Sequence, residues 1–493
     1  MALTGIAETV DGALKASWKA FIIYRKQGRS VHAAFLRNIA IKLAEREEEL
    51  VVTAAGETNL SEPRLKGELK RTIFQLNSYA DACEEGSWLD IRIDTADKER
   101  NPPKPSLRKM MVPLGPVVVF GASNFPFAYS TAGGDTACAL AAGCSVLVKA
   151  HPAHSMTSGL AASAIRSAAL DSGVPEDVFI HLESTSIETG IELVKHPVTR
   201  AVGFTGSFEG GKALFDLANQ RPLPIPVFAE MGSVNPVFLL PSKLQEDTDA
   251  IANMYAHSIT QSAGQFCTNP GLLVAIKGSG LEKFLGLLGD KIIKMQPEKM
   301  LHTGIADSFQ KNRFKTLEQE GVELIAGSTT GLQEGYGYPS IAKVSAGMYL
   351  KNPGLHKEVF GPFSLLVECR DMEEMEAVAL SLEGQLTATL MATPIEVKSN
   401  ESLVLKLEDC CGRFILNGVP TGVEVAMAMH HGGPFPATTD SRFTSVGADG
   451  IRRFARPVSF QNWEDDMLPP ELQDKNPLNL WRMVNNQWSR AEI

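Results

Sequence analysis

Between residues 115 and 219, short apolar runs alternate with stretches of helical spacing, and this alternation constrains the fold more than any other feature of the chain. The apolar runs lie at 116–120, 145–149, 177–182 and 201–206. Short, wholly apolar runs are typical of parallel strands that are buried on both faces. Helical stretches follow them, near 133–143, 154–172, 191–195 and 209–219. The pattern therefore predicts a domain of βαβ units in the α/β class.

The rest of the chain predicts further helices, an arm and a second α/β unit. Residues 12–54 and 63–84 have apolar side chains at helical spacing among charged ones. Residues 87–112 alternate, turn at a proline-rich segment and return as an apolar run, which predicts a β-hairpin arm. The α/β alternation begins again at residue 226, and a late strand near 455–463 precedes a polar tail.

Length and charge exclude several classes of protein. A chain of 493 residues is too long for one ordinary hydrophobic core, so two or three structural units are expected. The net charge of -10 argues against a nucleic-acid partner, which requires clustered lysine and arginine. Acidic residues interrupt the N-terminus, so no secretory signal is expected. Prolines and glycines interrupt the uncharged stretch 110–134, so no membrane-spanning helix is expected either.

Cysteine and histidine spacing gives no sign of disulfides or metal. The seven cysteines form no C-x-x-C pair and no regular framework, which indicates reduced thiols in a cytoplasmic protein. The close histidine pairs are His151 with His154 and His430 with His431, and no cysteine or carboxylate pattern accompanies them. No metal site is therefore predicted.

The stretch 261–271, QSAGQFCTNPG, places Cys267 among small, polar and turn-forming residues. Free cysteines are usually buried hydrophobic residues, and Cys138, Cys144 and Cys369 have the apolar surroundings of that role. Cys267 instead follows a predicted helix in a turn-rich segment, where a thiolate would have access and nearby dipoles. From the residues alone, a nucleophile and a structural cysteine are equally good interpretations of Cys267.

Two polar residues follow predicted strands. Glu230 ends an apolar run, where a carboxylate is costly unless it is paired or serves as a base with a raised pKa that activates water. A strand-end glutamate that reaches solvent is the simpler interpretation. Asn124 lies on a loop, where asparagine usually serves turn geometry, and an amide that donates to an oxyanion is the functional alternative.

Three further segments are candidates for nucleotide binding. Gly206 and Gly211 lie between a strand and a helix, where backbone amides can approach a pyrophosphate or nicotinamide, although a tight turn explains them equally well. Lys149 ends a predicted strand, either as a surface lysine or as a donor to ribose hydroxyls at the edge of the sheet. Glu358 and Phe360 lie near a Gly-Pro turn, either at the surface or beside the ribose and ring of a cofactor.

Taken together and in this order, these segments resemble the aldehyde dehydrogenase superfamily over nearly the whole chain. The resemblance rests on GASNFPF with Asn124, LVKAHP with Lys149, GFTGS at 203–207, AEMGSVNP with Glu230, GQFCTNPG with Cys267 and KEVFGPF at 357–363. Longer stretches, among them GVPTGVEVAMAMHHGGPFPATTDSRFTSVG, are similar to the α-ketoglutarate semialdehyde (2,5-dioxovalerate) dehydrogenase branch. That branch lies close to a bacterial NADP-linked fatty aldehyde dehydrogenase.

The resemblance implies an α/β fold with a Rossmann-type cofactor domain, an α/β catalytic domain and a β-hairpin oligomerisation arm. The implied division is 1–86 and 113–229 for the nucleotide-binding domain, 230–455 for the catalytic domain, and 87–112 with 456–493 for the arm and tail. Members of the family usually form dimers, often paired into tetramers, through such an arm. A homodimer or homotetramer is therefore expected.

The resemblance also implies a mechanism. The thiolate of Cys267 would attack an aldehyde, and the side-chain amide of Asn124 with the backbone N–H of Cys267 would hold the oxyanion. Hydride transfer to a nicotinamide would leave a thioester, and Glu230 would activate the water that hydrolyses it. The presence of Glu230 favours hydrolysis over acyl transfer to coenzyme A, because members that transfer the acyl group commonly lack this glutamate.

The same resemblance assigns the cofactor residues. Lys149 and Glu358 would hold ribose hydroxyls, Gly206 and Ser207 would pack at the nicotinamide end, and Phe360 would stack near the ring.

The choice between NAD and NADP depends on residues after the lysine. NAD-preferring members often carry a glutamate three residues after it, and here that position is Pro152, which tolerates a 2′-phosphate. Against this, residues 183–190 offer no arginine for the phosphate, and Glu209 would repel it if it lies nearby. Use of both cofactors with a modest lean toward NADP is expected.

The expected substrate is α-ketoglutarate semialdehyde, with two alternatives. One is a medium- or long-chain fatty aldehyde on the same scaffold. The other is a non-catalytic structural descendant, which would be expected to lose Cys267 or Glu230. A site for the semialdehyde must meet a carboxylate, so it needs cations or amide donors, and Arg442 is a candidate.

Overall fold

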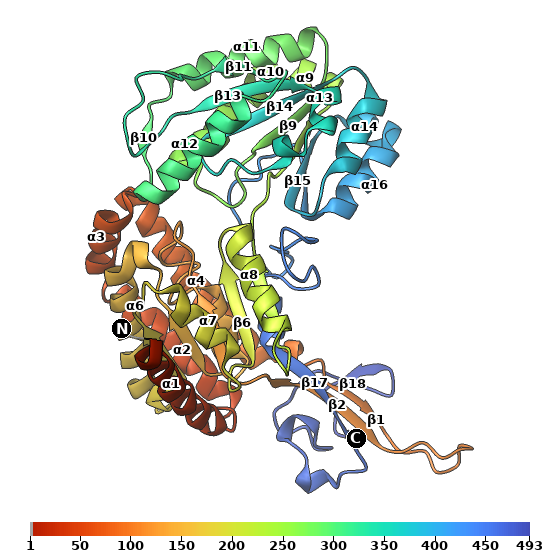
Figure 1. The fold of residues 1–493 in the computed structure, drawn as a ribbon. Helices are drawn as coiled ribbons and strands as arrows, with labels where there is room; N and C mark the ends of the chain where they lie inside the picture. The colour runs from red at the N-terminus through yellow and green to blue at the C-terminus, as the bar shows by residue number, and fades with distance from the viewer. Residues whose placement is uncertain (1–2) are drawn as a thin grey trace.

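The computed structural model describes residues 3–493, with side chains from residue 5 onward. The chain forms a lower lobe, an upper lobe and an arm that projects from the lower lobe (Figure 1). Helices α1–α8 lie in the lower lobe, and helices α9–α16 lie in the upper one. Across residues 3–493, no helix is both long and apolar enough to cross a membrane.

The lower lobe is built on a five-stranded sheet in which every neighbouring pair is parallel. Its strand order is β5-β4-β3-β6-β7, which is the order of a Rossmann mononucleotide-binding unit. The strands are β3 (Val117–Phe120), β4 (Val146–Lys149), β5 (Phe179–Leu182), β6 (Ala201–Thr205) and β7 (Val227–Glu230). The prediction of βαβ units is confirmed, and the order reverses between β3 and β6, where ligands bind in such sheets.

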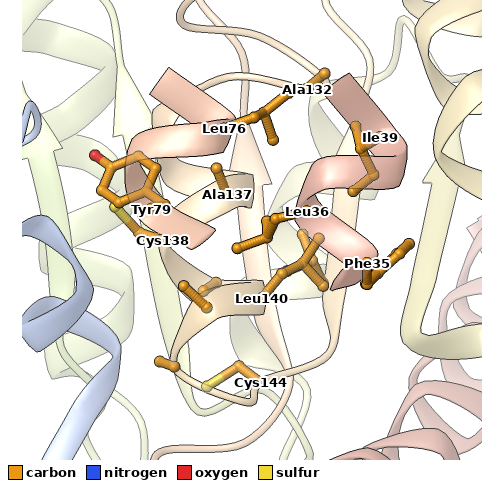
Figure 2. Close-up of a cluster of buried hydrophobic side chains, with 14 of the residues drawn as sticks. Phe35, Leu36, Ile39, Leu76, Tyr79, Ala132, Ala137, Cys138, Leu140 and Cys144 are labelled. Atoms are coloured by element: carbon orange, nitrogen blue, oxygen red, sulfur yellow. The ribbon is translucent and has the colours of Figure 1, made fainter. Parts of the chain in front are cut away.

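Helices cover both faces of this sheet and form the largest core of the molecule. They are α1 (Leu3–Tyr24), α2 (Arg29–Ala44), α3 (Glu47–Thr58), α4 (Glu62–Glu85), α5 (Gly134–Ala141), α6 (Ser155–Asp171), α7 (Ile187–Lys195) and α8 (Phe208–Asn219). Figure 2 shows Phe35 and Leu36 of α2, Tyr79 of α4 and Leu140 of α5 meeting in this core. Cys138 is fully buried there, as its apolar surroundings predict.

The upper lobe contains a seven-stranded sheet in the order β11-β13-β14-β9-β8-β15-β16. Its neighbours are parallel except for β11 and β13. The strands are β8 (Val237–Leu239), β9 (Leu272–Ile276), β11 (Glu323–Ala326), β13 (Ser340–Ser345), β14 (Phe363–Cys369), β15 (Gln385–Met391) and β16 (Cys411–Leu416). A short pair, β10 (Glu298–Lys299) and β12 (Tyr336–Gly337), lies apart from this sheet. The predicted second α/β unit is therefore present.

Eight helices accompany the upper sheet. They are α9 (Pro241–Glu246), α10 (Thr248–Thr260), α11 (Ser279–Lys294), α12 (Thr303–Leu317), α13 (Ala346–Lys351), α14 (Met372–Ser381), α15 (Pro394–Ser399) and α16 (Glu401–Cys410). The central strands β9, β14 and β15 are almost wholly buried, because helices pack on both faces of the sheet.

The arm is a five-stranded sheet in the order β17-β2-β1-β18-β19. Its strands are β1 (Arg92–Asp94), β2 (Leu107–Pro113), β17 (Ala455–Gln461), β18 (Arg482–Val484) and β19 (Gln487–Ser489). The predicted hairpin and late strand are present, but the first strand is shorter than the alternation suggested. Leu89 lies in a 3-10 turn, η1 (Ser87–Leu89), and Asp90 leaves it with a left-handed φ of 45°. The tail, predicted as merely polar, contributes β18 and β19.

The packing departs from the predicted division of the chain at one place. The segment η6 (Ala448–Phe454) belongs to the predicted range 230–455, but it packs against α5 in the lower lobe. Ile451 and Phe454 are buried in the same core as the helices around the Rossmann sheet. The predicted catalytic range therefore ends with residues that belong, by packing, to the other lobe.

Candidate active site

The carboxyl edge of the Rossmann sheet gathers four of the predicted residues. Asn124 lies on the loop after β3, Lys149 ends β4, Ser207 caps α8 directly after β6, and Glu230 ends β7. All these strands are parallel, so their carboxyl ends meet at one edge. Because this edge lies next to the point where the strand order reverses, it is the expected place for a ligand.

A short segment of left-handed backbone brings Cys267 from the upper lobe to this edge. After α10, the residues Ser262, Ala263 and Gly264 have φ values of 50°, 53° and 61°. Left-handed backbone is strained for residues with a β-carbon, and three in succession reverse the chain abruptly. Gly264 must also be glycine for reasons of space, because a β-carbon there would collide with the carbonyl group of Gly361. Cys267 follows three residues later, just before β9.

Cys267 meets a buried histidine and a buried glutamate. Its Sγ lies 3.7 Å from Nε2 of His431, and that nitrogen lies 2.9 Å from Oε1 of Glu230. The hydroxyl of Ser445 donates to the other oxygen of Glu230 at 2.9 Å. The side chains of His431 and Glu230 are almost completely buried, whereas Cys267 remains partly exposed.

The electrostatics differ from the prediction of a raised pKa at Glu230. Burial acts to raise the pKa of Glu230, but the charge of His431 and hydrogen bonds from His431 and Ser445 lower it by more. The pKa of Glu230 therefore lies below its usual value. Burial and the negative charge of Glu230 together raise the pKa of the Cys267 thiol well above normal. In the resting protein a protonated thiol consequently lies beside an ionised carboxylate.

His431 is the residue of this cluster that sequence reasoning missed. No cysteine or carboxylate pattern accompanies the histidine pair at 430 and 431 in the sequence, yet the structure places the thiol of Cys267 and the carboxylate of Glu230 beside His431. Ligand atoms of Glu230, Cys267 and His431 all lie within 4.8 Å of one another. The chain separates Glu230 from His431 by 201 residues, so no local signal links them.

Cys267 lines two cavities. The larger has a volume of about 890 Å³, and the smaller has about 230 Å³. The smaller cavity is also lined by six other predicted residues: Asn124, Gly206, Ser207, Glu230, Glu358 and Phe360. The structure thus brings together seven of the nine residues that the sequence singled out.

Lys149 and Gly211 line neither of these two cavities in the part of the chain that the structure describes. The ammonium group of Lys149 donates to the carbonyl of Ser184 at 2.9 Å, and burial lowers its pKa. Gly211 lies inside α8, where a β-carbon would approach Cγ of Met231 to 2.6 Å. Close packing against Met231 explains why a glycine stands at this position. A contact of Gly211 with a cofactor stays a prediction.

The carboxylate of Glu358 is held against a glycine in the wall of the smaller cavity. A β-carbon at Gly232 would lie 2.6 Å from Oε2 of Glu358, so a larger residue there would displace this carboxylate. Burial and the charge of Glu209 raise the pKa of Glu358 to about 8. The negative charge of Glu209 therefore reaches the part of the smaller cavity that Glu358 lines.

Asn124 lies beside Cys267 with its amide nitrogen turned toward the cysteine loop. Its Nδ2 donates to the carbonyl of Gln265 at 3.2 Å, which leaves the second N–H of the amide for another acceptor. Gln265 is itself fixed, because its Oε1 accepts from the backbone N–H of Leu301 at 3.0 Å. The amide is therefore held in place before any ligand binds.

The larger cavity shares Cys267 with the smaller one and is otherwise lined by different residues. Aromatic rings of Phe125, Tyr129 and Phe266 line it together with several arginines. Arg442, which the sequence suggested for a substrate carboxylate, is not among them. Its side chain is 79% exposed and pairs with Asp440. The expectation for Arg442 is therefore wrong, because its neighbourhood in the sequence does not bring it to the cavity.

Comparison with known proteins identifies the family of the chain. The model of the aldehyde dehydrogenase family matches residues 3–434. An α-ketoglutaric semialdehyde dehydrogenase of Azospirillum brasilense is 47% identical over 96% of this chain and 90% of its own length. A second α-ketoglutaric semialdehyde dehydrogenase, of Acinetobacter baylyi, is 43% identical over 97% of this chain and 91% of its own.

Solved structures show the same fold at low sequence identity. A glyceraldehyde-3-phosphate dehydrogenase of Methanocaldococcus jannaschii, complexed with NADP, has a TM-score of 0.79 and is 20% identical. The match covers 93% of this chain and 95% of the other. A betaine aldehyde dehydrogenase of Staphylococcus aureus in complex with NAD⁺ also has a TM-score of 0.79, at 17% identity over 93% and 90% of the two chains. From the match to the family model and the two relatives above 40% identity, the chain belongs to the aldehyde dehydrogenase family.

Proposed function

We propose that this enzyme oxidises α-ketoglutarate semialdehyde to α-ketoglutarate through a thioester on Cys267, with NAD or NADP as the oxidant. The substrate rests on the two relatives, which carry that activity in their names at 47% and 43% identity. The observation that carries the chemistry is the position of Cys267 between two cavities, with the buried carboxylate of Glu230 beside it.

The first step is attack on the aldehyde. The thiol of Cys267 gives its proton to the ionised carboxylate of Glu230, which His431 holds by a hydrogen bond. The thiolate then adds to the aldehyde carbon, and the carbonyl oxygen becomes an oxyanion. The free amide N–H of Asn124 and the backbone N–H of Cys267 stabilise that oxyanion by hydrogen bonding.

The smaller cavity suits a nicotinamide cofactor. It opens at the reversal point of the Rossmann sheet, and Gly232 leaves the space that lets Glu358 face it. Glu358 would hold ribose hydroxyls, Gly206 and Ser207 would pack at the nicotinamide end, and Phe360 would lie against the ring. A nicotinamide bound there supplies the hydride acceptor that turns the adduct on Cys267 into a thioester.

Hydrolysis completes the reaction. Glu230 first releases to solvent the proton that it took from Cys267, and its carboxylate then takes a proton from water, so that the resulting hydroxide attacks the carbonyl carbon of the thioester. Asn124 again stabilises the oxyanion, and the Cys267 sulfur leaves as a thiolate. The product is a carboxylate, and the presence of Glu230 favours this hydrolysis over transfer to coenzyme A.

We propose that the enzyme accepts both cofactors with a modest preference for NADP. Lys149 would hold the adenosine ribose, and Pro152 places no negative charge against a 2′-phosphate at that position. Comparison of kcat/KM for NADP and NAD at saturating aldehyde tests the preference, and a ratio far below one contradicts it.

We further propose a homodimer or homotetramer assembled through the arm. Trp463, Trp481 and Trp488 are about half exposed on the tail segment that forms part of the arm, although large aromatic side chains are usually buried. Light scattering at micromolar concentration tests this, and a monomer contradicts it.

A substrate panel with both cofactors tests the activity itself. α-Ketoglutarate semialdehyde is expected to give the highest kcat/KM, with pentanal and decanal well below it. Cys267→Ala is expected to abolish oxidation of every aldehyde, and a variant that keeps full activity would refute the thioester. A panel in which decanal is the best substrate would favour the fatty aldehyde alternative.

A further inference from the structure

The larger cavity contains three arginines that have no carboxylate partner. Arg64, Arg71 and Arg413 all line it, and Cys267 lies in the same wall. Within residues 3–493, every hydrogen bond of their guanidinium groups goes to a neutral oxygen, either a backbone carbonyl, a side-chain amide or a phenol. Partly buried arginines are normally paired, because removing an unpaired charge from water is costly.

Arg64 is the most rigidly held of the three. Its guanidinium carbon lies 4.8 Å from the ring centre of Phe266 and 5.1 Å from that of Phe125. One terminal nitrogen, Nη2, donates to the carbonyl of Asn124 at 2.8 Å. The other, Nη1, is buried without a hydrogen-bond partner. The planar group is thus fixed by packing, while donors remain for a ligand.

The other two arginines are Arg71, on the same helix α4 as Arg64, and Arg413, on strand β16. Arg71 on α4 makes only long hydrogen bonds, of 3.3–3.4 Å, to Gln75, Tyr129 and Val423. Arg413 on β16 donates to the carbonyls of Gly422 and Pro420, and its Nε is buried without a partner. The charge of Arg413 also acts to lower the pKa of Cys267, so it lies within electrostatic range of the sulfur.

The negative charges around the cavity offset these arginines only in part. Glu68 lines the cavity and attracts Arg64 and Arg71, but burial outweighs their effect and raises its pKa, and its Oε1 accepts hydrogen bonds from the backbone of Phe127 and Ala128. Glu424 is exposed to solvent. The cavity beside the nucleophile therefore has an excess of positive charge, and an anionic ligand would supply the missing partners.

We propose that Arg64, Arg71 and Arg413 form an anion subsite that binds the distal carboxylate of a short aldehyde acid while its aldehyde group lies at Cys267. This rests on the proposed function for the identity of the reacting end. Guanidinium groups bind carboxylates through paired N–H donors, which also fixes the orientation of the chain between the two ends. A neutral or long apolar aldehyde leaves these charges unpaired, so the subsite discriminates against it.

The test compares two substrates in three variants. Arg71→Gln and Arg413→Gln are each expected to raise KM for α-ketoglutarate semialdehyde by about 10-fold to 100-fold, because a hydrogen bond to a charged group is lost. In Arg71→Gln the KM for pentanal is expected not to rise, because pentanal has no carboxylate to bind; for Arg413→Gln the diagnostic quantity is the ratio of the KM values of the two aldehydes, since its charge also acts on the Cys267 thiol. Arg442→Gln is the matched control, since that arginine is exposed and lies outside the cavity. Equal losses on both aldehydes, or no loss on the semialdehyde, would overturn the subsite.

A binding measurement separates this proposal from the proposed function. Glutarate, a dicarboxylate that cannot react, is titrated calorimetrically into Cys267→Ala and into the same protein with Arg71→Gln or Arg413→Gln. The subsite predicts binding that either arginine variant weakens at least tenfold, whichever aldehyde the wild-type enzyme oxidises best. Equal binding in all three proteins refutes the subsite even if the semialdehyde is the best substrate. Equal thermal denaturation midpoints exclude misfolding as the cause of a loss.

Discussion

The imidazole of His431 lies 2.9 Å from the carboxylate of Glu230, although 201 residues separate the two in the chain. The hydrogen bond and the charge of His431 keep Glu230 ionised in surroundings that would otherwise favour its protonated form. The same nitrogen lies 3.7 Å from the sulfur of Cys267. The pair thus determines which side chains of the site carry a proton. The geometry of the site leads to four predictions.

Replacement of the carboxylate should block hydrolysis of the thioester. In Glu230→Gln, kcat is expected to fall by about 100-fold or more, since a positioned base contributes that much. Because Glu230 also takes the proton of the Cys267 thiol, the variant should be acylated slowly as well, and intact-protein mass spectrometry after mixing with aldehyde and cofactor should find mostly unmodified protein. Undiminished turnover would contradict the role of Glu230.

Removal of the histidine should shift the pH dependence of the reaction. Without His431 the effect of burial dominates, the pKa of Glu230 rises, and the carboxylate protonates at higher pH. The acid limb of kcat in His431→Gln is therefore expected to move to higher pH. Ser445→Ala, which removes one hydrogen bond from Glu230, should move it less in the same direction.

The neighbouring histidine provides the control for that shift. His430 lies in a different cavity, beside Arg442 and Asp449. His430→Gln is expected to leave the acid limb in place. A His431→Gln profile that overlays the wild type would show that Glu230 does not depend on the imidazole.

Loss of the amide donor should slow the chemical steps without harming the fold. Asn124→Ala removes the oxyanion donor, and kcat/KM is expected to fall by about 100-fold to 1000-fold. The backbone carbonyl that receives Arg64 remains, so the wall of the larger cavity is retained. Steady-state kinetics measures the loss, and an unchanged denaturation midpoint assigns it to chemistry. A fall below tenfold would remove Asn124 from the oxyanion site.

Glu358 should make stability depend on pH in the unusual direction for a carboxylate. Its pKa of about 8 in the folded protein exceeds the value of about 4.3 in an unfolded chain, so the folded state binds the extra proton. Stability is therefore full at low pH and decreases as pH rises through about 8. Glu358→Gln removes this loss, and its denaturation midpoint should exceed that of the wild type by roughly 2–4 °C or more at pH 8.5.

The same variant should show almost no difference from the wild type near pH 5. Glu209→Gln removes the charge that helps to raise the pKa of Glu358, and should give a smaller gain in the same direction. Differential scanning fluorimetry across pH 5–9 without cofactor measures both effects. A gain for Glu358→Gln that is equal at pH 5 and pH 8.5 would refute the raised pKa.

The sequence predicted those parts of the site that follow strand ends. Asn124 and Ser207 lie on the segments that follow β3 and β6, Glu230 is the last residue of β7, and parallel strands bring their carboxyl ends to one edge. Cys267 was predictable as a candidate because of its turn-rich neighbours. The resemblance to a family then joined residues whose local signals were individually ambiguous.

Residues that depend on distant packing escaped prediction. His431 reaches the site on an irregular loop, and the arginines of the larger cavity come from α4 and β16, which no local pattern relates to each other. Arg442 was favoured because it lies in a distinctive stretch, yet the loop turns it to solvent. The segment η6 similarly joins a core formed mainly by residues far earlier in the chain, and Arg453 pairs with Asp135, which lies 318 residues before it. Spacing along the chain carries no information about such contacts.

The position of Cys267 between two cavities has a consequence for covalent inhibitors. Because one sulfur forms part of both walls, an alkylating reagent can approach it from either side, and occupancy of the smaller cavity leaves the other approach open. A reagent too bulky for about 230 Å³ still fits within about 890 Å³. An electrophile that carries an acidic tail, matched to the arginines there, would react with this cysteine faster than one with a neutral tail of the same size.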